Sequence, residues 1–169
     1  MTTLTTRHLR IVSASNCARD RVPSPTLKLT AEVDAPVPPE RLYPFVSDLA
    51  RYPEWLGIVQ RAQPLADGAW IVDLRGRLGP FARSKRLRMV RTIAEAPSLA
   101  LFERAEEDGR QHSPWTLRAD VAPHPGGSRL TMHLSYGGAL LGAVIERILR
   151  EEIDDARRRL IELVVAQPA

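Results

Sequence analysis

Residues 140–165 read LLGAVIERILREEIDDARRRLIELVV, and this stretch sets the architecture of the whole chain. Apolar side chains recur every three or four residues, which places them along one stripe of an α-helix. The stripe consists of Leu141, Ile145, Leu149, Ile153, Ala156, Leu160 and Leu163. The opposite face is charged, with acids four residues ahead of arginines in the pairs Glu146–Arg150, Asp154–Arg158 and Asp155–Arg159. A helix of this length spans ~35 to 40 Å, so its apolar stripe needs a partner surface of similar length.

The preceding chain supplies that surface, because it has the pattern of a series of strands. Apolar residues alternate with polar ones at Leu27, Leu29, Ala31 and Val33, which predicts a first strand beginning at Thr26. Six more strands are predicted at about 58–65, 70–78, 82–93, 99–105, 111–122 and 129–136, separated by short turns rich in glycine and proline. Connections this short permit only antiparallel neighbours.

Two short helices are predicted between the first strand and the second. Proline is tolerated in the first turn of a helix, so the prolines at 36, 38 and 39 favour a helix over about 39–46. Pro44 lies inside that helix and is expected to kink or shorten it. Ser47 and Asp48 are good caps for a second helix that ends near Trp55. The economical packing of these elements is an α+β fold with a curved antiparallel sheet of about seven strands wrapped around the C-terminal helix.

Composition bounds the class of protein. A chain of 169 residues with 44% hydrophobic content is sufficient for one domain with its own core, predicted over residues 26–169. Residues 1–25 hold four arginines and one aspartate, so this basic extension carries +3 of the net charge of +4. Without interleaved aromatic residues the extension is a weak signal for nucleic acid. Apolar runs are too short for a membrane span, and no leader sequence is evident, so a cytoplasmic location is expected.

Several segments resemble a known superfamily. They are VDAP at 33–36, PERLY at 39–43, SDLARYPEW at 47–55, WTL at 115–117 and GGSRLTM at 126–132. Together with the order of elements, they are similar to the START-like, Bet v 1-like (SRPBCC) superfamily, and within it to the polyketide cyclase/dehydrase and lipid-transport branch. The resemblance covers about residues 27–165 and implies a helix-grip fold. It also implies that a hydrophobic small molecule binds between helix and sheet. Many members of the superfamily are carriers of such molecules, and some are cyclases.

Candidate ligand-binding residues follow from the inward faces of the predicted strands and helices. Large apolar and aromatic side chains there would serve as cavity wall or as plain core. The candidates are Trp55, Leu87, Met89, Phe102, Trp115, Leu117, Met132, Leu134, Tyr136, Leu141, Ile145 and Leu149. The two short helices, carrying Tyr52 and Trp55, are expected to act as a gate.

Two residues are candidates for catalysis, although neither carries a specific motif. Arg83 has the same strand parity as Leu87 and could pair with a carboxylate or an enolate, while the alternative places it in water at the rim of the sheet. Lys85 and Arg91 share that parity. His112 lies near Glu103 and could move a proton during ring closure, but histidines at strand ends are more often simply exposed.

The expected function is therefore binding or transport of a polyketide, isoprenoid quinone or lipid. The alternatives are a polyketide aromatase/cyclase that uses Arg83 and His112, and an interaction module that uses residues 1–25. Enzymatic activity is not the favoured hypothesis. The single cysteine, Cys17, excludes an internal disulfide, and no metal or other cofactor is expected. Nucleic acid is not an expected partner, whereas transient membrane contact and a monomer or homodimer stay open.

Overall fold

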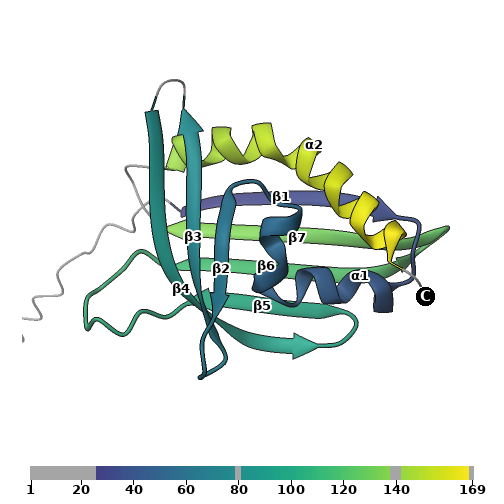
Figure 1. Cartoon of the computed structure of the whole chain (residues 1–169), viewed down its shortest axis with the longest axis horizontal. Helices are drawn as coiled ribbons and strands as arrows, with labels where there is room; N and C mark the ends of the chain where they lie inside the picture. Colours follow the sequence, from purple (N-terminus) through teal and green to yellow (C-terminus); the bar gives the residue numbers. More distant parts are fainter. Residues whose placement is uncertain (1–25, 79–80, 138–141, 168–169) are drawn as a thin grey trace, which may run out of the picture.

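The computed structural model describes residues 26–78, 81–137 and 142–167, and Figure 1 shows their arrangement. Seven strands form one antiparallel sheet in the order β1-β7-β6-β5-β4-β3-β2. The strands are β1 (Thr26–Ala35), β2 (Val59–Pro64), β3 (Ala69–Leu78), β4 (Phe81–Glu95), β5 (Leu99–Arg104), β6 (Trp115–His124) and β7 (Gly127–Gly137). The helices are α1 (Pro39–Val46), the 3₁₀ helix η1 (Leu49–Glu54) and α2 (Gly142–Ala166). The predicted helix-grip fold is confirmed.

The sheet curls strongly, so that β2, β3 and β4 stand across the direction of β1, β7 and β6 in Figure 1. Two register shifts mark irregular points in this curve, between Val59 and Arg61 in β2 and between Arg91 and Ile93 in β4. Extra residues of this kind bend a strand and increase its twist. The result is a concave face that α2 crosses.

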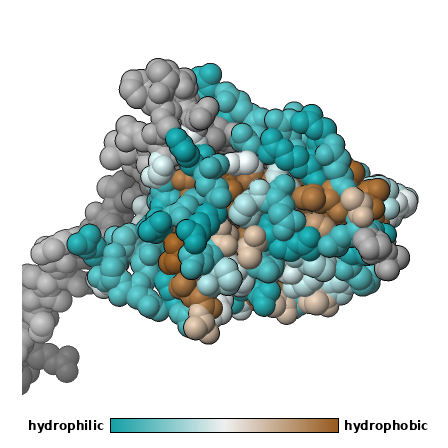
Figure 2. Space-filling model, viewed as in Figure 1, coloured by the Kyte–Doolittle hydropathy of each residue, from teal (hydrophilic) through white to brown (hydrophobic). Residues whose placement is uncertain are grey.

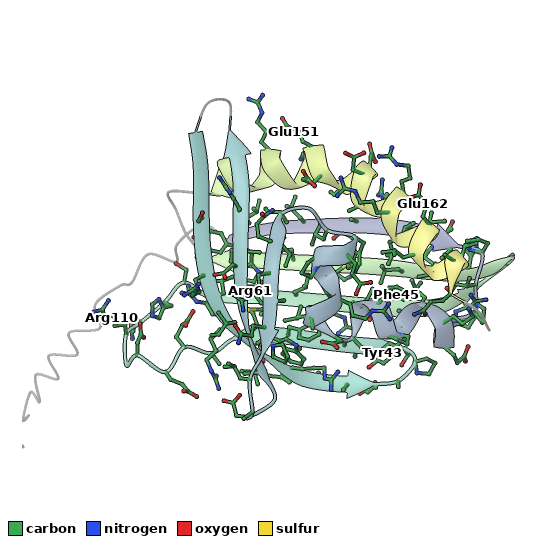
Figure 3. The ribbon with its side chains drawn as sticks, viewed as in Figure 1. Tyr43, Phe45, Arg61, Arg110, Glu151 and Glu162 are labelled. Atoms are coloured by element: carbon green, nitrogen blue, oxygen red, sulfur yellow. The ribbon has the colours of Figure 1, made fainter. Side chains whose placement is uncertain are left out.

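The terminal helix buries the stripe that its sequence predicts, as far as its side chains are described. Ala156 and Leu160 are buried, as is Val164, while Ile153 and Leu163 are half-buried. The side chains of Leu141, Ile145 and Leu149 lie outside the described part. The outward face of α2 is hydrophilic, with hydrophobic side chains showing beneath it (Figure 2). Acidic side chains such as Glu151 and Glu162 project from α2 away from the sheet (Figure 3).

The end of α2 is held by α1. The Arg41 guanidinium donates from Nη2 to the backbone carbonyl of Val164 at 3.0 Å and to that of Gln167. The last carbonyls of a helix lack partners within the helix, and a cation there also interacts favourably with the helix dipole. Arg41 therefore ties the C-terminus of α2 to the short helix α1, which lies beside it (Figure 1).

The two short helices are fixed to the sheet by polar contacts at their junction. Asp48 caps η1 through the backbone N–H of Ala50 at 2.9 Å, and the same oxygen accepts a hydrogen bond from the Trp70 indole at 3.1 Å. Arg91 donates to the carbonyl of Ser47 at 2.6 Å. The sequence predicted Asp48 and Ser47 as caps of this second helix, and Asp48 is its N-cap, whereas Ser47 is instead the C-terminal cap of α1. The links of these two residues to β3 and β4 were not predicted. The junction is thereby anchored to the middle of the sheet.

The first helix spans the eight residues predicted for it with Pro44 inside, so Pro44 does not shorten it, and the alternative of a kink stays a prediction. One strand boundary needs correction. The sixth strand begins at Trp115 and not at Gln111, since residues 111–114 form no strand. Residues 105–114 instead make a loop between β5 and β6, and Arg110 in this loop lies far from α2 (Figure 3).

The turn into β7 requires glycine. Gly127 has a φ of 154°, and a Cβ added there would lie 2.1 Å from the carbonyl oxygen of Ala35 and 2.8 Å from the backbone nitrogen of Val37. The neighbouring Ser128 is buried and donates its hydroxyl to the carbonyl of Val37 at 2.8 Å. The end of β1 and the start of β7 are thus in direct backbone contact.

Candidate ligand cavity

A cavity of about 360 Å³ lies between the concave face of the sheet, η1 and α2. Its volume falls within the range of about 300 to 1,000 Å³ that is usual for small-molecule sites. Most of the wall is aliphatic or aromatic: Leu29, Ala31, Val33, Leu49, Tyr52, Trp55, Leu56, Ile58, Val59, Val72, Leu74, Leu87, Met89, Trp115, Leu117, Leu130, Met132, Leu134, Ile153, Ala156 and Leu160. Such a wall favours a ligand that is largely apolar, because apolar surface gains about 25 cal/mol per Å² on leaving water.

Many of the predicted ligand-binding residues lie on this wall. They are Trp55, Leu87, Met89, Trp115, Leu117, Met132 and Leu134. Phe102 and Tyr136 are not on it, and the side chains of Leu141, Ile145 and Leu149 lie outside the described part. The strand parity therefore brought together residues of β4, β6 and β7 that do share one face.

Phe102 faces the same side of the sheet but is covered by other elements. Its ring packs edge-on against Trp70, with centroids 5.7 Å apart, and against Tyr52 at 6.4 Å. Phe102 is fully buried in the core. The short helices cover this part of the inner face, so an inward side chain on β5 meets η1 and not the cavity.

Tyr52 in η1 and Trp55 at its end line the cavity and are held in place by buried hydrogen bonds. The Tyr52 hydroxyl donates to the carbonyl of Val46 at 2.9 Å, and the Trp55 indole donates to that of Phe45 at 3.3 Å. Burial raises the pKa of Tyr52 well above its ordinary value, so this phenol stays protonated and continues to donate. Phe45 itself projects from α1, the helix that carries both acceptors (Figure 3).

Lys85 brings a positive charge to the cavity wall. Its Nζ lies 5.2 Å from the centroid of the Trp115 ring and 4.6 Å from that of Tyr136, and it lies 3.4 Å from the Tyr136 hydroxyl. A cation over aromatic faces is attracted by their quadrupoles. Sequence parity placed Lys85 inward, but it did not single it out from the neighbouring arginines.

Two further charged residues contribute to the wall, Glu32 on β1 and Arg157 on α2. Glu32 is exposed, in agreement with its place on the polar side of the β1 alternation. Arg157 donates to Asp154 at 3.1 Å, while its Nε is buried and has no hydrogen-bond partner among the described residues. The helical stripe did not predict this arginine, because position 157 lies on the flank of the charged face.

His112 is not on the cavity wall, and both of its ring nitrogens are occupied. Nδ1 lies 3.0 Å from Arg104 Nη2, which can only donate, so Nδ1 accepts and Nε2 carries the proton. Nε2 then donates to Asp108, whose two carboxylate oxygens are 2.9 Å away. This hydrogen bond is the main reason that the pKa of Asp108 lies below its ordinary value. The geometry makes His112 a surface contact of the 105–114 loop.

The other catalytic candidate is only partly placed. The backbone of Arg83 pairs with Gly76, a residue of the cavity wall, but the Arg83 side chain lies outside the described part. Across residues 26–78, 81–137 and 142–167 there is no group of three or more His, Cys, Asp or Glu side chains that could hold a metal ion. None of the helices in these ranges combines the length and apolar character that a membrane span needs.

Comparison with known proteins agrees with this geometry. The sequence profile of the family described as "Polyketide cyclase / dehydrase and lipid transport" matches residues 26–165, which is all of the sheet and nearly all of α2. No curated protein matches the chain.

Solved structures show the same fold at low sequence identity. Protein NE0264 from Nitrosomonas europaea is 11% identical, with a TM-score of 0.60 over 82% of this chain and 94% of that one. Protein TTHA0849 from Thermus thermophilus is 17% identical, with a TM-score of 0.58 over 86% of this chain and 100% of that one. The di-domain ARO/CYC BexL from the BE-7585A biosynthetic pathway is 17% identical, with a TM-score of 0.59 over 85% of this chain and 51% of that one.

Proposed function

Since the chain belongs to the polyketide cyclase/dehydrase and lipid-transport family of the START-like superfamily, we propose that it binds and carries a hydrophobic small molecule in the cavity between α2 and the sheet. The observation that carries this proposal is the cavity of about 360 Å³ with its nearly continuous apolar wall. A polyketide, an isoprenoid quinone or an acyl chain has the required character. The expected cytoplasmic location belongs to this proposal.

The mechanism follows from burial. A ligand of this kind loses its contact with water when it enters the cavity, and each buried methylene contributes about 0.8 kcal/mol. The hydrogen bonds of Tyr52 and Trp55 to α1 keep one wall in a fixed shape before binding. A preformed wall lowers the entropy cost of association. The gating role predicted for the two short helices stays a prediction.

Two experiments test the proposal. The first measures binding of N-phenyl-1-naphthylamine, an uncharged dye that fluoresces in apolar sites, and the second is mass spectrometry of lipids extracted from the purified protein. Met132→Trp fills the cavity from β7 and should abolish dye binding. His133→Trp is the matched control, because His133 is the next residue and is exposed on the other face. A wild-type protein that binds no dye and releases no lipid, or a Met132→Trp variant that binds dye normally, would contradict the proposal.

A polyketide aromatase/cyclase is the second candidate, and the likeness to BexL, which is described as an ARO/CYC, favours it. His112 forms no part of the cavity, so a cyclase here would depend on Arg83, whose side chain lies outside the described part, or on residues of the wall. Turnover of an aromatic polyketide precursor, measured for the wild type and for Arg83→Met, tests this candidate. Equal turnover in both proteins would remove Arg83 from it.

The third candidate, an interaction module, rests on the basic residues 1–25, which lie outside the described part. Deleting these residues and measuring binding to vesicles of anionic lipid tests it directly. Unchanged binding would count against the extension as a docking segment.

A further inference from the structure

Lys85 is a cation of the cavity wall for which the structure describes no acidic partner. Among the side chains that the structure describes, no carboxylate lies within ion-pair distance of its Nζ. The neighbouring arginines of β4 are paired, since Arg86 contacts Asp73 at 2.7 Å and Arg88 contacts Glu107 at 2.8 Å. Arg86 and Arg88 on the outer face of β4 therefore have acidic partners, whereas Lys85 on its inner face has none among the side chains described.

The surroundings of Lys85 leave most of its hydrogen-bonding capacity unused. An ammonium group has three donors. The one acceptor described for it is the Tyr136 hydroxyl at 3.4 Å, which is at the outer limit of a hydrogen bond. The remaining neighbours are the faces of Trp115 and Tyr136, which attract the cation but accept no conventional hydrogen bond. The group is thus positioned by its surroundings and still able to donate.

From this placement we propose that the cavity takes an amphipathic monoanion, a hydrophobic carboxylic acid, with its carboxylate on Lys85 and its apolar tail along the wall of α2 and the sheet. The proposal rests on the proposed function, because it names the class of ligand for the same cavity. A carboxylate accepts hydrogen bonds, and Lys85 Nζ on the wall supplies the donor, while the Tyr136 hydroxyl, which is not on the wall, lies 3.4 Å from that Nζ. A single positive charge matches a single negative one, which distinguishes a carboxylate from a phosphate dianion.

Arg157 is a poorer anchor for the same group. Its guanidinium already donates to Asp154, and its side chain is 39% exposed, so water and the carboxylate compete with any ligand. Lys85 is half-buried too, but no described carboxylate competes for it, and it lies beside Trp115, a buried residue of the wall.

The test compares dodecanoic acid with dodecanol, which share a chain and differ in charge, by displacement of N-phenyl-1-naphthylamine at neutral pH. Wild type should bind the acid more tightly, and Lys85→Met should lose roughly tenfold or more of its affinity for the acid while binding the alcohol normally. Lys85→Arg should retain much of the preference. Lys28→Met is the matched control, because Lys28 is exposed on β1 and its loss changes the net charge by the same amount.

A measurement on the wild-type protein tests the carboxylate anchor without using any variant. With dodecanoic acid labelled with ¹³C at the carboxyl, the NMR shift of the bound acid should titrate at a lower pH than it does in water, because a nearby cation favours the ionised form. Equal affinity for acid and alcohol, or a bound carboxyl that titrates higher than in water, would overturn the anchor and leave the carrier function intact. Binding of neither compound, nor of the dye, would overturn both.

Discussion

Alanine substitutions at Leu87 and Phe102 distinguish an inward residue of the cavity wall from an inward residue of the packed core. Both are essentially inaccessible to solvent, at 2% and 0% exposure, and they lie on the paired strands β4 and β5. They differ in what lies beyond the side chain: the cavity for Leu87, and the rings of Tyr52 and Trp70 for Phe102. Truncating them to alanine should therefore have different consequences.

Phe102→Ala should cost about 4 to 5 kcal/mol, because it opens a new void in packed core and removes two edge-on aromatic contacts. Leu87→Ala should cost about 2 to 3 kcal/mol, since it extends a space that already exists and adds little new void. The same change should weaken binding of N-phenyl-1-naphthylamine by roughly fourfold to fifteenfold, the equivalent of losing contact with one or two methylenes.

Urea unfolding followed by circular dichroism gives the stability differences, and dye titration well below the unfolding midpoint gives the affinities. Phe102→Ala should bind the dye within about twofold of wild type once it is folded. If alanine at 102 prevents folding, Phe102→Leu supports the same comparison at a smaller cost. The reasoning would be refuted if a change at 102 altered dye affinity as much as Leu87→Ala does, because Phe102 would then belong to the wall.

Three further outcomes are expected. Gly127→Ala should destabilise the fold by about 3 kcal/mol or more in thermal melts, because the new Cβ meets backbone atoms. Gly57→Ala is the comparison and should cost less than about 1 kcal/mol, because its new Cβ meets only the far ends of the long side chains Glu152 and Arg159 on α2. Arg41→Ala should cost about 1 to 2 kcal/mol in urea unfolding through the lost cap on α2, with Arg41→Lys recovering part of it. The hydrogen bond from Arg129 holds the pKa of the Asp34 carboxyl below its ordinary value of 3.8. The ionised pair therefore stabilises the fold above pH 3.8, and this stabilisation is lost as the pH falls toward the lower pKa of the folded state. Asp34→Asn should therefore flatten the acid limb of a stability–pH curve below about pH 4, and an unchanged limb would show that this pair contributes nothing.

Local sequence chemistry predicted the elements well where a single residue type controls a boundary. The first helix was predicted over 39–46 and spans Pro39–Val46, because proline is pre-set for the first turn and Ser47 is poorly suited to continue it. The alternation that begins at Thr26 likewise defines β1. The sixth strand was placed four residues too early, since residues 111–114 lack both alternation and a partner strand.

The site was predictable only to the level of a face. Strand parity places Met89, Phe102 and Trp115 on the concave side, and all three are there, but parity cannot say which part of that side the short helices will cover. Which strand residues η1 covers depends on tertiary packing, and it is the contact with Tyr52 of η1 that separates Phe102 from the cavity. The same limit applied to Lys85, whose importance depends on which carboxylates reach it and not on its place in β4.

The pairing of β1 with β7 has a consequence for how the chain acquires its structure. Their paired residues lie about one hundred positions apart, so β1 leaves the ribosome long before β7, the strand it pairs with in the described sheet. At about 5 to 20 residues per second, the delay is roughly 5 to 20 s. Throughout that time β1, a strand with a complete apolar face, lacks the strand it pairs with in the folded protein. Folding therefore depends on the slow, long-range pairing of β1 with β7, and the exposed strand is a site for chaperone binding.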